Sequence, residues 1–211
     1  MQPDAFLARS VLICEGASEV GLLRGLDLHR MTAGQVSLNA HGVALVDAGG
    51  VTKIYVRANA LASLGYRVAV LRDDDVKPDA GEEGVFEVGG GDLFKWQDGQ
   101  ALEQALFAGV SDNGVHLLLE RAVEIHGEEL IAAHIDTTSS GIMSLADCRG
   151  RMTDLIRTTL ADAAKYKKNS WFKTVSCMEE AARDIIGPDL PNARPEFRAA
   201  IEAVFNWCAD A

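Results

Sequence analysis

The segment Ser10-Val-Leu-Ile-Cys-Glu-Gly-Ala-Ser-Glu19 decides how the first half of this chain is expected to fold. Its first five residues are almost continuously apolar, which is typical of a strand buried on both faces of a parallel sheet. Glu15 and Gly16 end that run, and Ser18 stands where it can cap a helix with apolar residues from Val20 to Leu26. The segment therefore predicts a buried strand, a tight turn and a helix.

Strand and helix signals alternate up to residue 72. Further apolar runs at residues 42–47 and 66–72 predict a second and a third strand. Between them, apolar residues at a 3.6-residue spacing predict a helix over residues 51–62, with Gly65 as its natural stop. Alternating strands and helices with short links indicate right-handed crossovers and a parallel sheet. We therefore expect an α/β fold with ligands at the carboxyl ends of the strands.

The rest of the chain is predicted to be mostly helical. A short strand is expected at residues 85–88, before the turn Gly89-Gly90-Gly91, and a loop is expected at residues 137–141. Helices with apolar stripes are predicted at residues 101–106, 117–125, 145–164, 175–186 and 197–208. We predict an α/β domain over residues 1–109 and an all-helical region over residues 110–211, whose helix after Lys173 packs back on the first domain.

Composition excludes several classes of protein. The chain has 211 residues, of which 48% are apolar, so a mainly disordered chain is excluded. No run of 18 apolar residues and no cationic, apolar leader is present, so we expect neither a membrane span nor a secretory signal. The four cysteines form no Cys-x-x-Cys pair, which disfavours disulfides and zinc and indicates a cytoplasmic protein.

Acidic residues follow two of the predicted strands. Glu15 ends the first strand, and Glu19 lies one helical turn later. Asp73 and Asp75 follow the third strand and point to the same side. Asp74 points to the opposite side, where it is expected to cap a helix or to be solvated. If these strands are neighbours, four carboxylates converge, and they cannot all stay ionised without a counter-charge. A divalent cation resolves this, and oxygen-only ligands suit Mg²⁺, Mn²⁺ or Ca²⁺. Taken singly, each acid has a purely structural explanation: the acids after the strands as helix caps or solvated loop residues, and Glu19 as a complement to the helix dipole.

This order of elements resembles the Toprim domain shared by topoisomerases, bacterial primases and certain nucleases. The first strand ends in Glu-Gly and the third in Asp-x-Asp, as in that domain. More closely, the chain resembles the nucleases of the OLD (overcoming lysogenization defect) family. The segments that carry this closer resemblance are Glu15-Gly-Ala-Ser-Glu19, Asp47-Ala-Gly-Gly50, Leu64-Gly65, Asp73-Asp-Asp75, Trp96 with Ala101-Leu-Glu103, and Ser170-Trp-Phe-Lys173.

The resemblance implies a Toprim-like (Rossmann-like) catalytic domain at residues 1–109 and a helical domain at residues 110–211. It implies a DNA endonuclease or nickase, or an exonuclease, that hydrolyses phosphodiesters with two Mg²⁺ or Mn²⁺ ions, with Ca²⁺ binding non-productively. The expected catalytic residues are Glu15, Asp73, Asp75 and Lys173. The expected metal ligands are Glu15, Glu19, Asp73, Asp75 and Glu103, the last by similarity alone.

The resemblance also concerns partners. OLD proteins carry an ABC-type ATPase half before the Toprim domain, but this chain has no Gly-rich segment ending in Gly-Lys-Ser/Thr. We therefore expect no ATP site, and either the nuclease portion of an ATPase–nuclease or a stand-alone nuclease. DNA is the expected partner, no membrane is expected, and a homo-oligomer is compatible with the sequence.

Basic residues are concentrated in one segment of this otherwise acidic chain. The chain has 20 Lys and Arg against 31 Asp and Glu, a formal net charge of −11, which by itself disfavours a nucleic-acid partner. Residues 149–173, however, contain seven basic and two acidic residues. A solvated amphipathic helix explains part of this pattern. A face that contacts the DNA backbone also explains it, with the expected contacts Arg149, Arg151, Lys165, Lys167 and Lys168.

Two alternatives remain open at this point. A phosphatase of the haloacid dehalogenase type would use an Asp-x-Asp nucleophile, but that pair is expected on the first strand, which here ends in Glu15. A non-catalytic regulatory module would bind a divalent ion for structure and cleave nothing.

Overall fold

Four parallel strands form one sheet in the order β2-β1-β3-β4. The computed structural model describes residues 3–97, 99–166 and 168–210. In chain order the elements are η1 (Pro3–Leu7), β1 (Ser10–Cys14), α1 (Ala17–Thr32), β2 (Val43–Asp47), α2 (Val51–Ser63), β3 (Arg67–Arg72), α3 (Ala80–Val88), β4 (Asp92–Lys95), α4 (Leu102–Gly109), α5 (Asp112–His126), α6 (Glu128–Ser139), α7 (Leu145–Cys148), α8 (Asp154–Ala164), α9 (Val175–Ala181), the π-helical η2 (Ala182–Ile186), α10 (Gly187–Asp189), η3 (Leu190–Asn192) and α11 (Pro195–Ala209).

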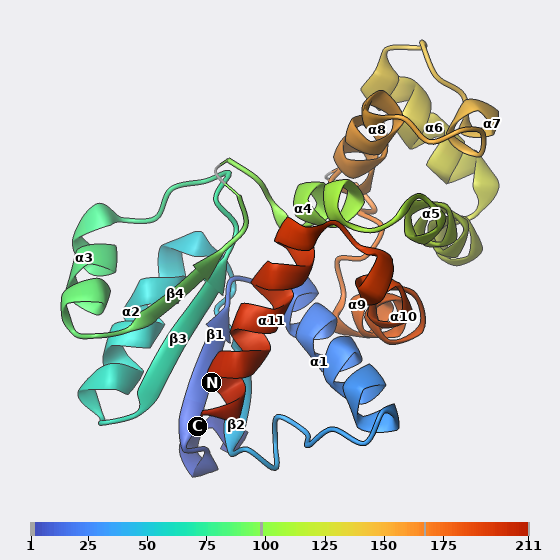
Figure 1. The fold of residues 1–211 in the computed structure, drawn as a ribbon. Helices are drawn as coiled ribbons and strands as arrows, with labels where there is room; N and C mark the ends of the chain where they lie inside the picture. The colour runs from blue at the N-terminus through green and yellow to red at the C-terminus, as the bar shows by residue number, and fades with distance from the viewer. Residues whose placement is uncertain (1–2, 98, 167, 211) are drawn as a thin grey trace.

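Side chains of the central strands alternate between two apolar cores. Val11 and Ile13 of β1 pack in one core with residues of α2 and α3, including Tyr55 and Phe86. Leu12 and Cys14 face the opposite core, which α1, α4 and α11 cover, and this core continues into the helical region. Because strand residues point to alternate faces, the almost continuously apolar strand β1 is buried on both sides, as expected. Figure 1 shows α2 and α3 on one side of the sheet and α1 and α11 on the other.

The helix that follows Lys173 lies against the first helix of the α/β part. A Cβ atom added to Gly21 would come within 2.5 Å of the Val175 carbonyl oxygen, and one added to Gly25 would come within 2.2 Å of the Glu179 carbonyl oxygen. The two glycines thus allow α1 and α9 to approach at backbone distance. This contact holds the start of α9, and the loop before it, near the carboxyl ends of the strands.

Several local predictions were wrong. Residues 85–88 are the end of α3 and not a strand, because Asp79 caps a helix by accepting hydrogen bonds from the Gly81 and Glu82 N–H groups. The fourth strand follows the three glycines instead. Ser18 does not cap α1, since Gly16 is the N-cap residue and the buried Ser18 hydroxyl has no hydrogen-bond partner.

In the helical region the predicted boundaries also differ from the observed ones. The single helix predicted at residues 145–164 is broken into α7 and α8, each begun by its own cap, Ser144 and Thr153. Helix α6 runs through Ser139, into the predicted loop. In Figure 1, α5 to α8 lie beyond α4, away from the sheet. No helix within the described parts of the chain is long and apolar enough to cross a membrane.

Candidate metal and nuclease site

The first and third strands are neighbours, which is the condition that the expected convergence of the acidic residues requires. Strand β1 pairs with β3 in parallel, with Cys14 opposite Leu71, so both strands end at the same edge. The Glu15 N–H donates to the Leu71 carbonyl oxygen (2.9 Å), which extends the pairing by one residue. The Glu15 side chain then accepts a hydrogen bond from the Asp73 N–H at Oε2 (3.1 Å). The two acidic motifs are therefore joined directly.

Glu19 enters this edge from the first turn of α1. Its Oε2 atom accepts a hydrogen bond from the Gly16 N–H (2.9 Å), which satisfies one free donor at the start of the helix. The residue is only 4% exposed. Such burial is costly for a carboxylate unless a cation or a proton offsets its charge.

Helix α4 adds a further acid from another part of the chain. Asp73 Oδ1 accepts a hydrogen bond from the Leu102 N–H (2.9 Å), so Asp73 serves as a side-chain acceptor at the start of α4. The next residue, Glu103, is 3% exposed. Its Oε1 atom lies 3.9 Å from Lys173 Nζ, an ion pair whose lysine side chain is 67% exposed.

The segment before Lys173 is fixed by Trp171. This side chain is fully buried and packs edge-to-face on Phe107 of α4, with ring centroids 6.0 Å apart. Its indole N–H donates to His134 Nδ1 (3.2 Å), and its carbonyl oxygen lies 2.9 Å from His126 Nε2. The helices α5 and α6 thereby help to hold Lys173 beside Glu103.

Burial and neighbouring carboxylates raise the pKa values of Glu15, Glu19 and Asp73. Burial raises the pKa of Glu19 to about 7, and the nearby carboxylates of Glu103 and Glu15 add to the shift. Burial, followed by the charges of Glu19, Glu15 and Glu103, raises the pKa of Asp73 to about 8. The pKa of Glu15 is raised mainly by burial, while the Asp73 N–H and Lys173 act in the opposite direction. Glu15, Glu19, Asp73 and Glu103 therefore form one electrostatically coupled cluster, which we call the acidic cluster.

Comparison with known proteins agrees with this arrangement. Residues 6–75 match the family described as "Overcoming lysogenization defect protein-like, TOPRIM domain". Over this third of its length the chain is similar to an OLD-like Toprim domain. The matched segment contains β1 to β3 and three members of the acidic cluster, whereas Glu103 and Lys173 lie outside it.

Two solved structures are similar to the chain over most of its length. The C-terminal region of the Xanthomonas campestris pv. campestris OLD protein is 14% identical, with 97% of each chain covered and a TM-score of 0.47. The C-terminal region of the Burkholderia pseudomallei OLD protein is also 14% identical, with 96% of this chain and 99% of that chain covered and a TM-score of 0.47. Among curated proteins, no relative matches the sequence.

Asp75 and Asp47 lie at the same edge of the Toprim sheet in different surroundings. Asp75 Oδ2 lies 2.8 Å from Lys165 Nζ, an ion pair that reaches across to the end of α8, and the charge of Asp75 also acts on Glu15. Asp47 Oδ1 accepts a hydrogen bond from the Gly49 N–H (2.7 Å), which is the arrangement of a turn residue. The structure thus brings Asp75 near the acidic cluster but engages it with a lysine.

The residues of the Toprim edge fit hard divalent cations by their chemistry. All the donors are carboxylate oxygens, the ligands that Mg²⁺, Mn²⁺ and Ca²⁺ prefer. In Glu15, Glu19 and Asp73 a backbone N–H engages one oxygen, so the other remains for a metal. Lys173 lowers the pKa of both Glu15 and Glu19, but one lysine cannot offset four carboxylates. As the side chains stand, no three Asp, Glu, His or Cys residues in the described ranges form a ready-made cage, so binding requires side-chain rotation.

The predicted DNA-contacting residues differ in whether acidic side chains already pair with them and in whether they are exposed. Arg149 is held by Glu120 (2.8 Å) and Glu128 (3.4 Å), whereas Arg151 and Lys168 are exposed. Lys167 lies outside the residues that the structure describes. Arg157, which contributed to the basic character of this segment, is buried and donates to the carbonyl oxygens at the end of α4.

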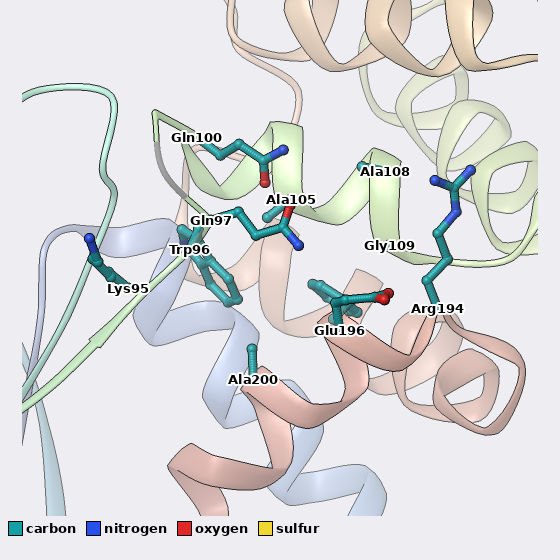
Figure 2. Close-up of a pocket in the computed structure, with 11 residues that line it drawn as sticks. Lys95, Trp96, Gln97, Gln100, Ala105, Ala108, Gly109, Arg194, Glu196 and Ala200 are labelled. Carbon is teal, nitrogen blue, oxygen red and sulfur yellow. The ribbon is translucent and has the colours of Figure 1, made fainter.

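A separate pocket of about 860 Å³ lies across α4 from the acidic cluster. The β4–α4 loop, α4 and the start of α11 line it, with Gln97, Gln100 and Arg194 among the polar residues (Figure 2). Its floor includes Trp96, which stacks on Phe197 with ring centroids 6.0 Å apart. Arg194 is already paired with Asp154 (3.0 Å). Among the described residues that line the pocket, the cations Arg194 and Lys95 are therefore both paired, the latter with Asp74 (3.7 Å).

One part of the site escaped sequence analysis. Asp74 was expected to point away and to cap or be solvated, but it is 1% exposed and forms an ion pair with Arg72 (2.9 Å), which is also buried. Lys77 first, and then the Gly99 N–H, hold the pKa of Asp74 well below its ordinary value. The only sequence signal was an arginine ending an apolar strand, and this signal does not reveal its partners.

Proposed function

We propose that this chain is a DNA nuclease that hydrolyses phosphodiesters with two divalent ions, Mg²⁺ or Mn²⁺, in the manner of an endonuclease or nickase. The observation that carries the proposal is the convergence of the acidic cluster on Lys173 in an OLD-like Toprim domain. Carboxylates from four elements, the ends of β1 and β3 and the helices α1 and α4, contribute to the cluster. The raised pKa values of Glu15, Glu19 and Asp73 indicate a need for positive charge that one lysine does not meet.

The proposed metal ligands are the members of the acidic cluster together with Asp75. When bound, such ions polarise the phosphoryl group and lower the pKa of a water molecule that attacks it. Glu15 and Asp73, which are held together by the Asp73 N–H, would bind on the sheet side. Glu19 and Glu103 would bind from the helices α1 and α4.

The proposed role of Lys173 is to hold a non-bridging oxygen of the scissile phosphate and to offset the charge that develops on it. Its side chain is mostly exposed and reaches Glu103 only at 3.9 Å, so it is free to turn toward a substrate. A metal ion held by Glu103 would offset the charge of that carboxylate and so weaken its ion pair with the Lys173 ammonium group.

The proposed site of DNA contact extends from Lys173 along the end of α8. Lys165 is paired with Asp75 at the edge of the site (2.8 Å), so metal binding by Asp75 would free Lys165 for a backbone phosphate. The OLD family suggests further that such a chain works beside an ABC-type ATPase. We propose that partner on the resemblance, with no ATP site of the chain's own.

The phosphatase alternative fits the fold less well. Its Asp-x-Asp pair belongs on the first strand, whereas here the pair follows β3, and β1 ends in Glu15. A phosphatase would also leave the buried Glu19 and Glu103 without a function. We therefore prefer the nuclease.

The direct test is incubation of supercoiled plasmid with the protein and Mg²⁺ or Mn²⁺. We expect nicked or linear DNA with either ion and none with EDTA. Asp73→Ala and Lys173→Ala should each reduce the rate by at least about 100-fold, in line with the loss of a preorganised charge at a reacting centre.

The matched control is Glu129→Ala. Glu129 is an exposed acid on α6, one of the helices that lie away from the sheet (Figure 1). This variant should cleave like the wild type. Plasmid that stays intact under all conditions, or equal cleavage by Asp73→Ala, would refute the nuclease and leave a non-catalytic metal-binding module as the better reading.

A further inference from the structure

Asp74 is the most completely engaged carboxylate at the edge of the Toprim sheet. Its side chain is fully buried and accepts hydrogen bonds from Arg72 Nη1 (2.9 Å), Lys77 Nζ (2.7 Å) and the Gly99 N–H (2.9 Å). Lys95 Nζ lies 3.7 Å away. The carboxylate thus gathers three cations and one backbone donor.

These contacts connect two segments that are about 25 residues apart. The Asp74 N–H donates to the Gln100 carbonyl oxygen (2.8 Å), and the Asp74 side chain accepts from Gly99. Two residues farther on, the Leu102 N–H donates to Asp73 Oδ1 (2.9 Å). Three hydrogen bonds therefore clamp the loop between β4 and α4 onto the end of β3.

We infer that Asp74 is a positioning residue that sets the place of Glu103 relative to Asp73 and Glu15. This inference rests on the proposed function, in which these three acids bind metal. Helix α4 begins at Leu102, so the clamp fixes its first turn, and Glu103 is the second residue of that turn. A shift of the loop would carry Glu103 with it.

The negative charge of Asp74, and not only the shape of its side chain, holds the buried Arg72 in place. Arg72 is 3% exposed and also donates to the Asp73 carbonyl oxygen (2.7 Å), so it holds the backbone of a proposed ligand. A buried guanidinium keeps this place only with an anion beside it. Glu83 of α3 supplies part of that charge (2.9 Å), and Asp74 supplies the rest.

The other side of the same loop faces the pocket behind α4. Lys95, Trp96, Gln97 and Gln100, all in Figure 2, belong to the end of β4 and to this loop. The loop therefore has an open pocket on one side and the Asp74 contacts on the other. Trp96 anchors the start of the loop by packing on Phe197, while the part around Gly99 and Gln100 is held by its hydrogen bonds to Asp74.

The test compares Asp74→Asn with Glu83→Gln. Both variants remove one negative charge next to Arg72, but only Asp74 contacts the β4–α4 loop. Outer-shell partners of metal ligands typically change metal affinity or activity 10–100-fold. We expect Asp74→Asn to lower Ca²⁺ affinity, measured by calorimetry, and kcat for plasmid nicking by about 10-fold or more, with little change in KM. Glu83→Gln should change both by less than about 3-fold.

Hydrogen exchange gives a readout that does not depend on activity. In Asp74→Asn the amides of Gly99 and Leu102 should exchange at least about 10-fold faster than in the wild type, while amides of β1 should not change. Equal effects of the two variants on Ca²⁺ affinity, or wild-type exchange at Gly99 and Leu102 in folded Asp74→Asn, would overturn the inference.

Two further outcomes are distinguishable. A wild-type protein that binds Ca²⁺ but cleaves no DNA would refute the nuclease, while calorimetry and exchange would still decide the role of Asp74. If Asp74→Asn does not fold, Lys77→Met removes a mostly exposed partner of the same carboxylate. Lower Ca²⁺ affinity of that variant supports positioning by Asp74, and unchanged affinity contradicts it.

Discussion

At the scale of single residues, the acidic cluster is a site that destabilises its own metal-free form. Glu19 and Asp73 have pKa values of about 7 and about 8, which burial and neighbouring carboxylates raise above their ordinary range. Near neutral pH the folded protein must therefore hold protons there or ionise buried groups at a cost. A divalent cation removes the need for either.

This arrangement predicts how stability depends on pH. A carboxyl group whose folded pKa is raised stabilises the fold fully below its unfolded pKa, about 4, and this contribution is lost as pH rises through 7 to 8. In EDTA, the melting temperature should fall between pH 6 and pH 8.5, and Mg²⁺ should raise it more at pH 8.5 than at pH 6.

Differential scanning calorimetry checks this prediction. Glu19→Gln removes one of the titrating groups, so it should flatten the fall between pH 6 and pH 8.5. An Mg²⁺ effect that is equal at the two pH values in the wild type would contradict the electrostatic account of the site.

At the scale of elements, the site depends on helices that meet from distant parts of the chain. The α1–α9 contact requires Gly21 and Gly25, and it places the start of α9 near the acidic cluster. A side chain at either glycine would push directly on the backbone of α9. The loop before α9 carries Lys173, so a change in the packing of α1 on α9 would also move Lys173.

Gly25→Ala tests that coupling. The added Cβ would lie 2.2 Å from the Glu179 carbonyl oxygen and 2.6 Å from Ala182 Cβ, so α9 must move. We expect a loss of about 1–3 kcal/mol in the free energy of unfolding, measured with urea, because overpacking costs this much. DNA cleavage should fall as well.

Gly84→Ala is the matched control for that substitution. Gly84 lies inside α3 with no atom within 4 Å of an added Cβ, so alanine should be neutral or stabilise by up to about 1 kcal/mol. Equal stability changes for the two variants would show that α1 and α9 do not pack at backbone distance.

The same elements show what sequence reasoning can and cannot reach. The apolar runs before Glu15 and Asp73 predicted two parallel strands of one sheet correctly, because strand period and short crossovers leave few topologies. That these two strands are neighbours emerged only from the structure. Residues 85–88 were misread because so short an apolar run fits either period, and the Asp79 cap decided for a helix. Glu103 was placed only by resemblance, and the burial of Asp74 was missed, since both depend on the distant β4–α4 segment, which no local pattern encodes.

At the scale of the whole molecule, a net charge of −11 does not exclude a DNA partner, but it limits how DNA can be held. Several of the acids lie at one sheet edge, where metal ions would offset them. The basic segment is less uniform than its sequence indicates, because Arg157 is buried and Arg149 is held by two glutamates. Affinity for DNA should therefore be modest and salt-dependent.

This distribution predicts different effects for two cations of the same segment. Lys168→Ala should weaken binding of a labelled duplex in Ca²⁺ and reduce the slope against salt by about 1, because each phosphate contact contributes that much. Arg149→Ala should change neither quantity much, since Glu120 and Glu128 already engage the side chain. Fluorescence anisotropy at several salt concentrations measures both the affinity and its dependence on salt. A larger loss of DNA affinity for Arg149→Ala than for Lys168→Ala would contradict the proposed site of DNA contact.

The central claim is that a glutamate from outside the matched Toprim segment completes the catalytic site. The most direct measurement is therefore the rate of plasmid nicking in Mg²⁺ by Glu103→Gln, with Glu129→Gln as the control. We expect Glu103→Gln to fold and to nick plasmid at least about 10-fold more slowly than the wild type, and Glu129→Gln to cleave like the wild type. Wild-type cleavage by Glu103→Gln would contradict it.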